Sequence, residues 1–229
     1  MNPRTLILGA LLLLQCAPLV LPERDTGSGA VGGIKVTLRS ELGVFPFGPD
    51  IVYFARVDDG DPASPYERIV PTRALTGCGL VMFNPPPGVY VAVGAWYRVD
   101  APMFLGNDFE EQMYRTYTVT VIFPEEVIRN SRIEIKPGGV AFCGSYSLRM
   151  KWSWYDIEAH LDATEQKAYA SIGHFDDDFL DGGKSDAYST ARLLKSARGA
   201  ETEDAFFRCM GDSLPAGYWR SLILERNRH

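Results

Sequence analysis

The sequence has little of what the common enzyme motifs require. It contains only three histidines, His160, His174 and His229, and no H-E-x-x-H or similar pair, so the usual ligand set of a zinc hydrolase is missing. It also lacks G-x-S-x-G, which excludes the nucleophile elbow, although residues far apart in a sequence can still assemble a triad. We expect a non-enzymatic protein without a cofactor, and a hydrolase with an unrecognised site is the alternative.

Positive charge is also scarce. The 229 residues carry 23 Lys and Arg against 29 Asp and Glu, which gives a formal net charge of −6. The basic residues form no visible stripe along the sequence, so nucleic acid is not an expected partner. Aromatic residues make up 12% of the chain, which argues against disorder because large side chains supply burial that offsets chain entropy.

Hydrophobic runs are no longer than nine residues. The first, at 6–14, follows Arg4 and has the length of the apolar region of a signal peptide, short of the ~20 residues that cross a bilayer. The second, at 89–97, is typical of a strand. We therefore expect residues 1–15 to be a signal peptide that exports the chain.

The end of the first run resembles the bacterial lipobox, in which a cysteine just past the apolar region is lipid-modified and becomes the mature N-terminus. In Leu13-Leu14-Gln15-Cys16, Leu13 fits this pattern, whereas Gln15 stands where a small residue is usual. No A-x-A-like cleavage site follows. The pattern predicts lipidation of Cys16, which anchors the protein to a bacterial membrane at the cell envelope; a periplasmic or secreted protein is the alternative.

Three further cysteines, Cys78, Cys143 and Cys209, cannot all pair within one chain. An exported compartment permits a disulfide. Cys78 and Cys143 both lie in a β-rich region, and we predict that pair, while Cys143–Cys209 would instead link the C-terminal segment to the sheet. No C-x-x-C occurs, which argues against a zinc ribbon or a thioredoxin-type redox site.

A polar, Gly-rich segment without periodicity covers residues 22–33. This composition is typical of a flexible tether, so we expect residues 16–33 to comprise the lipid-attachment cysteine and a tether that lifts the domain off the membrane. Gly27, Gly29 and Gly32 form a G-x-G-x-x-G pattern. A dinucleotide site requires a strand before this pattern and a helix after it, and here a strand follows, so no nucleotide is expected.

Between residues 34 and 155 the dominant hydrophobic period is two, which is the mark of strands with one buried face. Gly- and Pro-containing turns separate the alternating segments. We predict strands at 34–38, 51–57, 80–83, 89–97, 117–123, 132–135 and 146–154. Residues 34–158 are therefore expected to form a mainly β domain, an antiparallel β-sandwich of seven or eight strands.

From about residue 159 the period becomes helical. Asp162 and Glu165 form a capping box that predicts a helix to about Ile172. Further short amphipathic helices are predicted over 185–199, from Thr202 onwards and from Pro215 onwards. Residues 159–229 are thus expected to be a C-terminal α-helical extension.

Two segments resemble a known family. Residues 83–91, Phe-Asn-Pro-Pro-Pro-Gly-Val-Tyr-Val, are similar to the start of a strand in transthyretin-like and carboxypeptidase-regulatory-like β-sandwiches. Residues 133–144 resemble the strand, Pro-Gly turn and aromatic element of uncharacterised bacterial lipoproteins that carry such a domain. The resemblance implies a seven-stranded sandwich and a non-catalytic role, and it carries over no site residue.

Two candidate sites remain. Asp176, Asp178 and Asp181 lie in an acidic, Gly-containing segment whose oxygens suit Ca²⁺, but their spacing does not fit an EF-hand, and we expect a solvated loop. Trp152 and Trp154 alternate with polar residues and are expected in the core; if exposed, they would stack on a sugar or anchor a peptide. The expected role is structural or a protein interaction at the envelope, and a carbohydrate- or peptide-binding module is the alternative.

Overall fold

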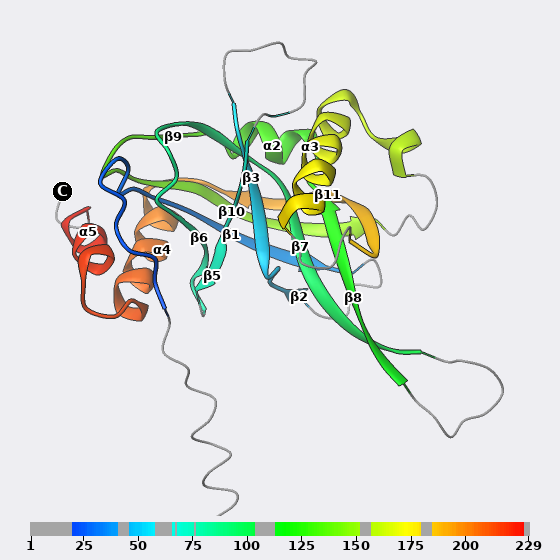
Figure 1. Cartoon of the computed structure of the whole chain (residues 1–229), viewed down its shortest axis with the longest axis horizontal. Coiled ribbons are helices and arrows are strands. Elements are labelled where there is room, and N and C mark those ends of the chain that lie inside the picture. Colours follow the sequence, from blue (N-terminus) through cyan, green and yellow to red (C-terminus); the bar gives the residue numbers. More distant parts are fainter. Residues whose placement is uncertain are drawn as a thin grey trace, which may run out of the picture.

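The computed structural model describes residues 20–40, 46–57, 66, 68–75, 77–103, 113–151, 157–179 and 185–226. In these residues a large curled sheet carries helices around it (Figure 1). The strands are β1 Val31–Arg39, β2 Pro46–Phe47, β3 Ile51–Arg56, β4 Ile69–Pro71, β5 Arg73–Leu75, β6 Gly79–Phe83, β7 Gly88–Met103, β8 Met113–Ile122, β9 Ile133–Ile135, β10 Val140–Lys151 and β11 Ala187–Ala197. The helices are α2 Glu125–Asn130, the 3₁₀ helix η1 Ile157–His160, α3 Ala163–Phe179, α4 Ala200–Ser213 and α5 Tyr218–Arg226.

The described strands form one sheet in the order β4-β3-β7-β8-β11-β10-β1-β6-β5, with β2 beside β1 and β9 beside β7. β1 is parallel to β10 and β8 is parallel to β11. The sheet curls into a half-barrel (Figure 1). The mainly β class is confirmed, and the antiparallel sandwich is corrected to a curled mixed sheet. Alternating side chains specify which face of a strand is buried, but they leave its neighbour and direction open.

The helix predicted over 185–199 is wrong, because residues 187–197 form strand β11. β11 lies between β8 and β10 and pairs with both. In the sequence, the adjacent Leu193 and Leu194 resemble the apolar face of an amphipathic helix. The buried residues of β11, however, include the β-branched Thr190, which suits a strand. The C-terminal segment after residue 158 therefore contributes a central strand, and it is not a purely helical extension.

The other C-terminal helices are confirmed. α3 begins at the predicted capping box: Glu165 N–H donates to Asp162 Oδ1 over 2.8 Å, and Asp162 N–H donates to Glu165 Oε2 over 3.1 Å. α4 covers the segment predicted from Thr202, and α5 begins three residues after Pro215. None of the helices in the described ranges is long and apolar enough to cross a membrane.

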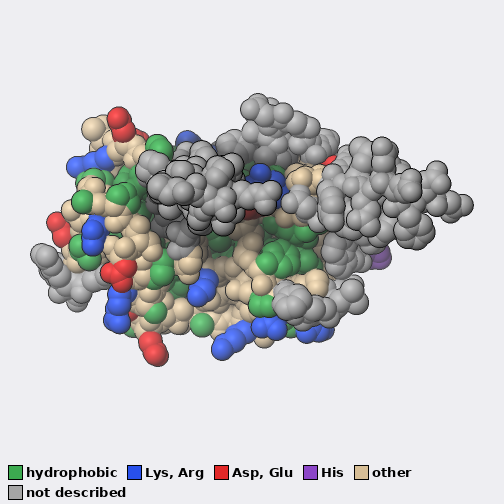
Figure 2. Space-filling model, turned by 90° about the horizontal axis from the view of Figure 1, so that it is seen from below, with side chains coloured by type: hydrophobic (Ala, Val, Ile, Leu, Met, Phe, Trp, Pro, Cys, Tyr) green, Lys and Arg blue, Asp and Glu red, His purple; other side chains and the backbone are tan. Residues whose placement is uncertain are grey.

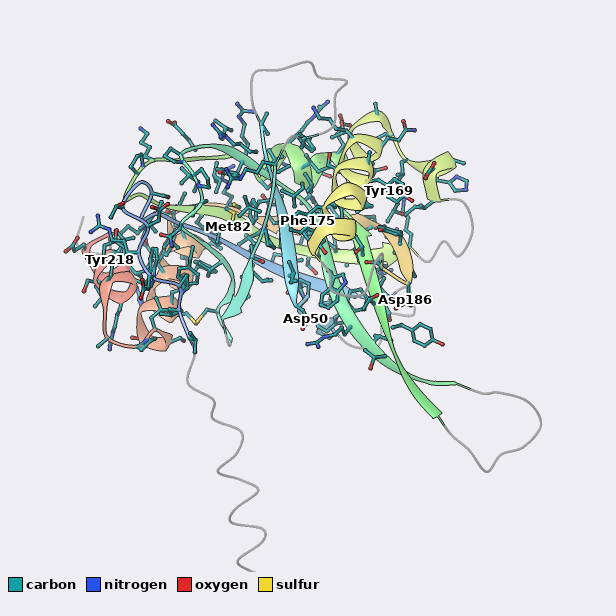
Figure 3. All side chains as sticks on the ribbon, viewed as in Figure 1. Asp50, Met82, Tyr169, Phe175, Asp186 and Tyr218 are labelled. Carbon is teal, nitrogen blue, oxygen red and sulfur yellow. A yellow bond between two sulfur atoms is a disulfide. The ribbon has the colours of Figure 1, made fainter. Side chains whose placement is uncertain are left out.

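The sheet carries a hydrophobic core on each of its faces. Ile34 and Val36 of β1 belong to the larger core, whereas Val31 belongs to the smaller one. α3 packs on the larger core, where the ring of Phe175 lies 5.8 Å from that of Tyr53 (Figure 3). α4 and α5 pack on the opposite face and supply most of the smaller core: Phe206, Phe207, Met210, Leu214, Trp219 and Ile223.

The Gly-rich segment is a second correction, because residues 28–33 are buried and the residues before them hydrogen-bond to the domain, as a free tether would not. They pass alongside α4 and α5 (Figure 1). Tyr218 O–H donates to the carbonyl of Gly29 over 2.8 Å, and Trp219 Nε1–H donates to the carbonyl of Pro22 over 2.8 Å. Gly29 has a φ of +54°, and a Cβ atom at Gly33 would lie 2.3 Å from Phe206. The glycines permit a close approach to helices that a tether would not make.

Candidate functional site

One side of β1 has a gap in its strand pairing. On one side β1 has β10 along its length. On the other side, residues 31–34 pair with β6 and residues 38–39 pair with β2. In the described part of the chain, no strand pairs with residues 35–37 on that side. An unpaired stretch of strand exposes main-chain hydrogen-bonding groups that a ligand can use.

The main chain of Val36 faces this gap. Ala30 C=O accepts from Asn84 N–H over 3.0 Å on the β6 side, whereas Val31 N–H donates to Gly139 over 2.9 Å on the β10 side. The N–H and C=O of successive residues point in alternate directions along a strand, so Val36 directs both groups toward the gap. The N–H and C=O of Val36, a residue that is 4% exposed, thus lie on the side of β1 that has no strand partner among the described residues.

The gap has local causes on both sides. If the register of Leu38 with Phe47 is continued, Val36 stands opposite Pro49, which has no N–H to donate. If the register of Ile34 with Leu80 is continued, Val36 stands opposite Cys78. Cys78 instead turns toward α4, where it forms a disulfide. Pro49 can accept but cannot donate a ladder hydrogen bond, and the pairing with β6 ends at Ile34, before Cys78 is reached.

A cleft of about 450 Å³ opens at the gap. Its lining combines apolar side chains with exposed main chain, and Lys35 stands among them as a cation: Lys35, Val36, Thr37, Pro46, Phe47, Gly48, Pro49, Gly77, Cys78, Gly79 and Leu80. Phe47 packs on Tyr97 with ring centroids 5.0 Å apart. Burial raises the pKa of Tyr97 to about 12, so the ring behind the cleft stays neutral. The site is suited to an apolar group next to an amide.

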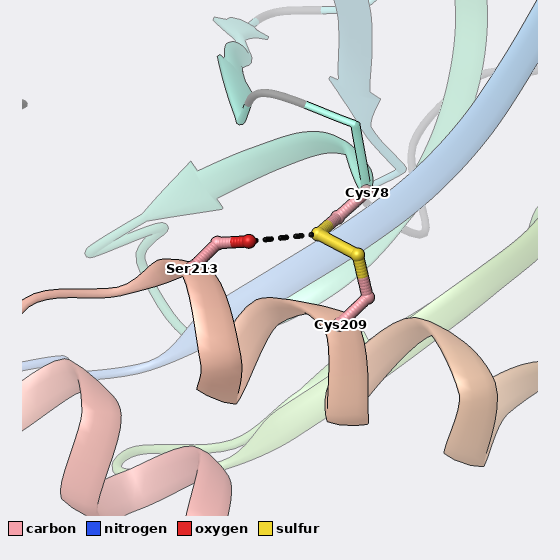
Figure 4. The surroundings of a disulfide bond; sticks show 3 residues. All are labelled: Cys78, Cys209 and Ser213. Carbon is pink, nitrogen blue, oxygen red and sulfur yellow. Dashed lines mark hydrogen bonds between the residues drawn. A yellow bond between two sulfur atoms is a disulfide. The ribbon is translucent and has the colours of Figure 1, made fainter.

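The disulfide at the wall of the cleft joins Cys78 to Cys209, with their Cα atoms 5.6 Å apart (Figure 4). Ser213 Oγ lies 3.3 Å from Cys78 Sγ. The predicted Cys78–Cys143 pair is wrong because the sheet separates the two residues: Cys143 is buried in the larger core, and Cys78 lies in the smaller core on the other face.

Cys143 is a free thiol. Burial raises its pKa well above the usual value, and the charge of Arg198 opposes that rise without cancelling it. A thiol held in its neutral form is a poor nucleophile and a poor metal ligand. Cys143 therefore acts as a small apolar side chain of the larger core.

Several predicted site residues lie outside the described residues: Cys16, Trp152, Trp154 and Asp181. Asp176 and Asp178 lie on the last turns of α3, and their side chains are also outside the described part of the chain. Among the residues that are described, no group of three or more His, Cys, Asp or Glu is placed to hold a metal ion. Lipidation of Cys16 and the calcium candidate therefore stay predictions.

The sequence predictions did not include the cleft. A local signal existed in the short segment Pro46-Phe47-Gly48-Pro49, whose prolines limit strand pairing. No family model, no curated protein and no solved structure matches this chain. The chemistry of the cleft is therefore the basis for a functional proposal.

Proposed function

We propose that this chain is an exported, lipid-anchored protein of the bacterial cell envelope that acts by binding an extended segment of a protein partner and is not an enzyme. The observation that carries the proposal is the stretch of β1 around Val36 that has no strand partner on one side among the described residues, beside an apolar cleft. An extended peptide can add to such an edge through main-chain hydrogen bonds, while the cleft selects its side chain.

The geometry sets the class of peptide. One ligand residue can exchange two hydrogen bonds with Val36, each contributing about 0.5–1.5 kcal/mol. Its own side chain then lies on the same face as Val36, toward Phe47 and Leu80, so an aliphatic or aromatic residue is favoured at this position. Because the gap is only three residues long, the affinity should be modest unless the partner also contacts the surface around it.

The anchor part of the proposal rests on the apolar run that ends just before Cys16. We expect the mature protein to begin at Cys16 and to carry two or three acyl chains, enough for stable membrane attachment. Intact mass spectrometry of protein extracted from a bacterial membrane fraction measures this. A mature chain that begins after residue 16, or one that retains Met1 and has an unmodified Cys16, would contradict the anchor.

Filling the cleft should abolish peptide binding. Gly48 lies in the lining, and a Cβ atom there meets no other atom within 4 Å, so Gly48→Trp places an indole in the cleft without a backbone clash. The probe is a blocked pentapeptide, Val-Thr-Val-Thr-Val, whose central valine would face Phe47 and Leu80, and binding is followed by the NMR shift of the Val36 amide. We expect the Kd to rise at least tenfold, since about 1.4 kcal/mol of lost contact suffices.

Gly173→Trp is the matched control, because a Cβ atom added at Gly173 of α3 also meets no atom within 4 Å and this residue lies outside the cleft. This variant should bind like the wild type. A second control peptide carries proline at its centre, which removes the N–H that Val36 C=O would accept. Equal binding of both peptides, or of both variants, would refute the peptide site.

A further inference from the structure

A second surface lies on the open part of the sheet, on the same face as α4 and α5. Phe206 of α4 covers β1 as far as Gly33, and the next outward position, Lys35, is exposed. Beyond that point the outward positions of β1, β10 and β11 carry six cations: Lys35, Arg39, Arg149, Lys151, Arg192 and Lys195. We call this surface the cationic face. The three strands contain no Asp or Glu.

The strand register concentrates this charge. Arg39 is paired with Arg149, and Arg149 is paired with Arg192, so three arginines stand in one row across strands ~4.8 Å apart. Lys195 stands opposite Ser147 in the next row. Like charges directly opposite one another destabilise a sheet, so this row costs stability in the isolated protein.

Five of the six cations have no carboxylate partner among the described residues, and the sixth, Lys151, lies near Glu165. None of the six belongs to an ion pair there, and Nε of Arg149, in the middle of the row, is buried without a hydrogen-bond partner. Lys151, at the end of β10, lies near Glu165, whose pKa is raised by burial and lowered by this lysine to a smaller extent. Figure 2 shows Lys and Arg side chains (blue) along the lower right margin of that view. An anionic ligand would supply the missing charge.

The position of the N-terminus indicates which kind of anionic ligand binds the cationic face. Leu21 packs on the smaller core, so the chain leaves the domain on the side of the sheet that carries the cationic face. Only residues 17–20 separate Cys16 from Leu21, a reach of about 18 Å when extended. An anchor at Cys16 therefore holds this side of the domain against the bilayer.

We infer that the cationic face lies on the membrane and binds anionic lipid headgroups. The choice of a lipid surface over another polyanion rests on the proposed anchor. The face is formed by three neighbouring strands, and its hydroxyls, from Thr37, Ser145 and Ser147, can donate to phosphates beside the arginines. Basic residues next to an anionic bilayer surface are attracted to it within a Debye length.

The test uses the chain without the expected signal peptide, residues 1–15, and with Cys16→Ser, so that no lipid is attached. We expect it to sediment with vesicles containing about 30% phosphatidylglycerol, to leave pure phosphatidylcholine vesicles in solution, and to dissociate at about 0.5 M NaCl. A triple variant should have a partition coefficient for the anionic vesicles at least tenfold below that of the parent; it carries Arg39→Gln, Arg149→Gln and Arg192→Gln. Relief of the like-charge row should leave the melting temperature of this variant unchanged or higher.

The matched control changes three exposed cations of α2 and β9 and their flanks: Arg129→Gln, Arg132→Gln and Lys136→Gln. It has the same net charge as the first variant and should bind vesicles like the parent. An equal loss of vesicle binding in both triple variants, or equal binding to anionic and neutral vesicles, would overturn the inference. Tighter binding of a single-stranded oligonucleotide than of vesicles at equal salt would also overturn it and make the face a nucleic-acid site.

The experiments can reject the lipid anchor and the membrane role of the cationic face independently of each other. If Cys16 is acylated but the two triple variants bind vesicles equally, the inference about the face is lost and the anchor stands. If Cys16 is unmodified while the Arg39, Arg149 and Arg192 variant alone loses binding, the face stands as a peripheral membrane site and the anchor is lost.

Discussion

Gly33→Ala is expected to lower the free energy of unfolding by about 2–3 kcal/mol. A Cβ atom at this position would lie 2.3 Å from Cε1 and 2.6 Å from Cζ of Phe206. The ring has little room to move, because it is buried and lies 4.7 Å from the ring of Phe142 and 5.2 Å from that of Phe207. Urea unfolding followed by circular dichroism measures the change.

Gly48→Ala is the control for Gly33→Ala, since its Cβ meets no atom within 4 Å, and its stability should stay within about 0.5 kcal/mol of the wild type. A second substitution, Phe206→Leu, should cost less in the Gly33→Ala background than alone, because the two sites are in contact. A flexible tether would tolerate alanine at Gly33. Wild-type stability of Gly33→Ala would therefore contradict the packed N-terminal segment.

Breaking the Cys78–Cys209 disulfide is expected to cost about 3–5 kcal/mol. The bond spans a sequence separation of 131, so its loss restores much conformational freedom to the unfolded chain. It also leaves α4 held to the sheet by the packing of the smaller core alone. The melting temperature of Cys209→Ser should fall, and dithiothreitol should lower that of the wild type by a similar amount.

Cys143→Ala serves as the control, because it keeps the disulfide and should remain sensitive to dithiothreitol. A tryptic digest without reductant should contain peptides 74–98 and 209–220 as one linked species. Peptide 133–149 should carry a thiol that alkylates only after unfolding, because Cys143 is fully buried. A linkage between peptide 133–149 and either of the others would show that the pairing is different.

The disulfide shows why sequence reasoning failed at one site. Cys78 and Cys143 both follow the alternating β-rich pattern, and nothing local to either residue tells which face of the sheet it occupies. The faces are set by the register of β1 with β6 and β10. Since a side chain changes face with every residue, an irregularity of a single residue decides which cysteines can meet.

β11 shows a second reason why a prediction from the sequence was wrong. Its sequence is compatible with a helix, and only the strands β8 and β10 on either side make the extended form favourable by pairing its main chain. By contrast, the start of α3 was predictable because Asp162 and Glu165 bond to main-chain groups within one turn of each other. Local contacts are visible in a sequence, and pairing between distant segments is not.

The mainly β class, most of the strands and the start of α3 follow from the order of the residues, because side-chain periods and caps are properties of near neighbours. Three other features emerge only when the chain is folded: the Gly-rich segment packs on α5, Val36 has no strand partner on one side among the described residues, and Arg39, Arg149 and Arg192 stand in one row. Each of these depends on which distant strands and helices become neighbours, since a strand contributes equally well to several registers until its partners close around it.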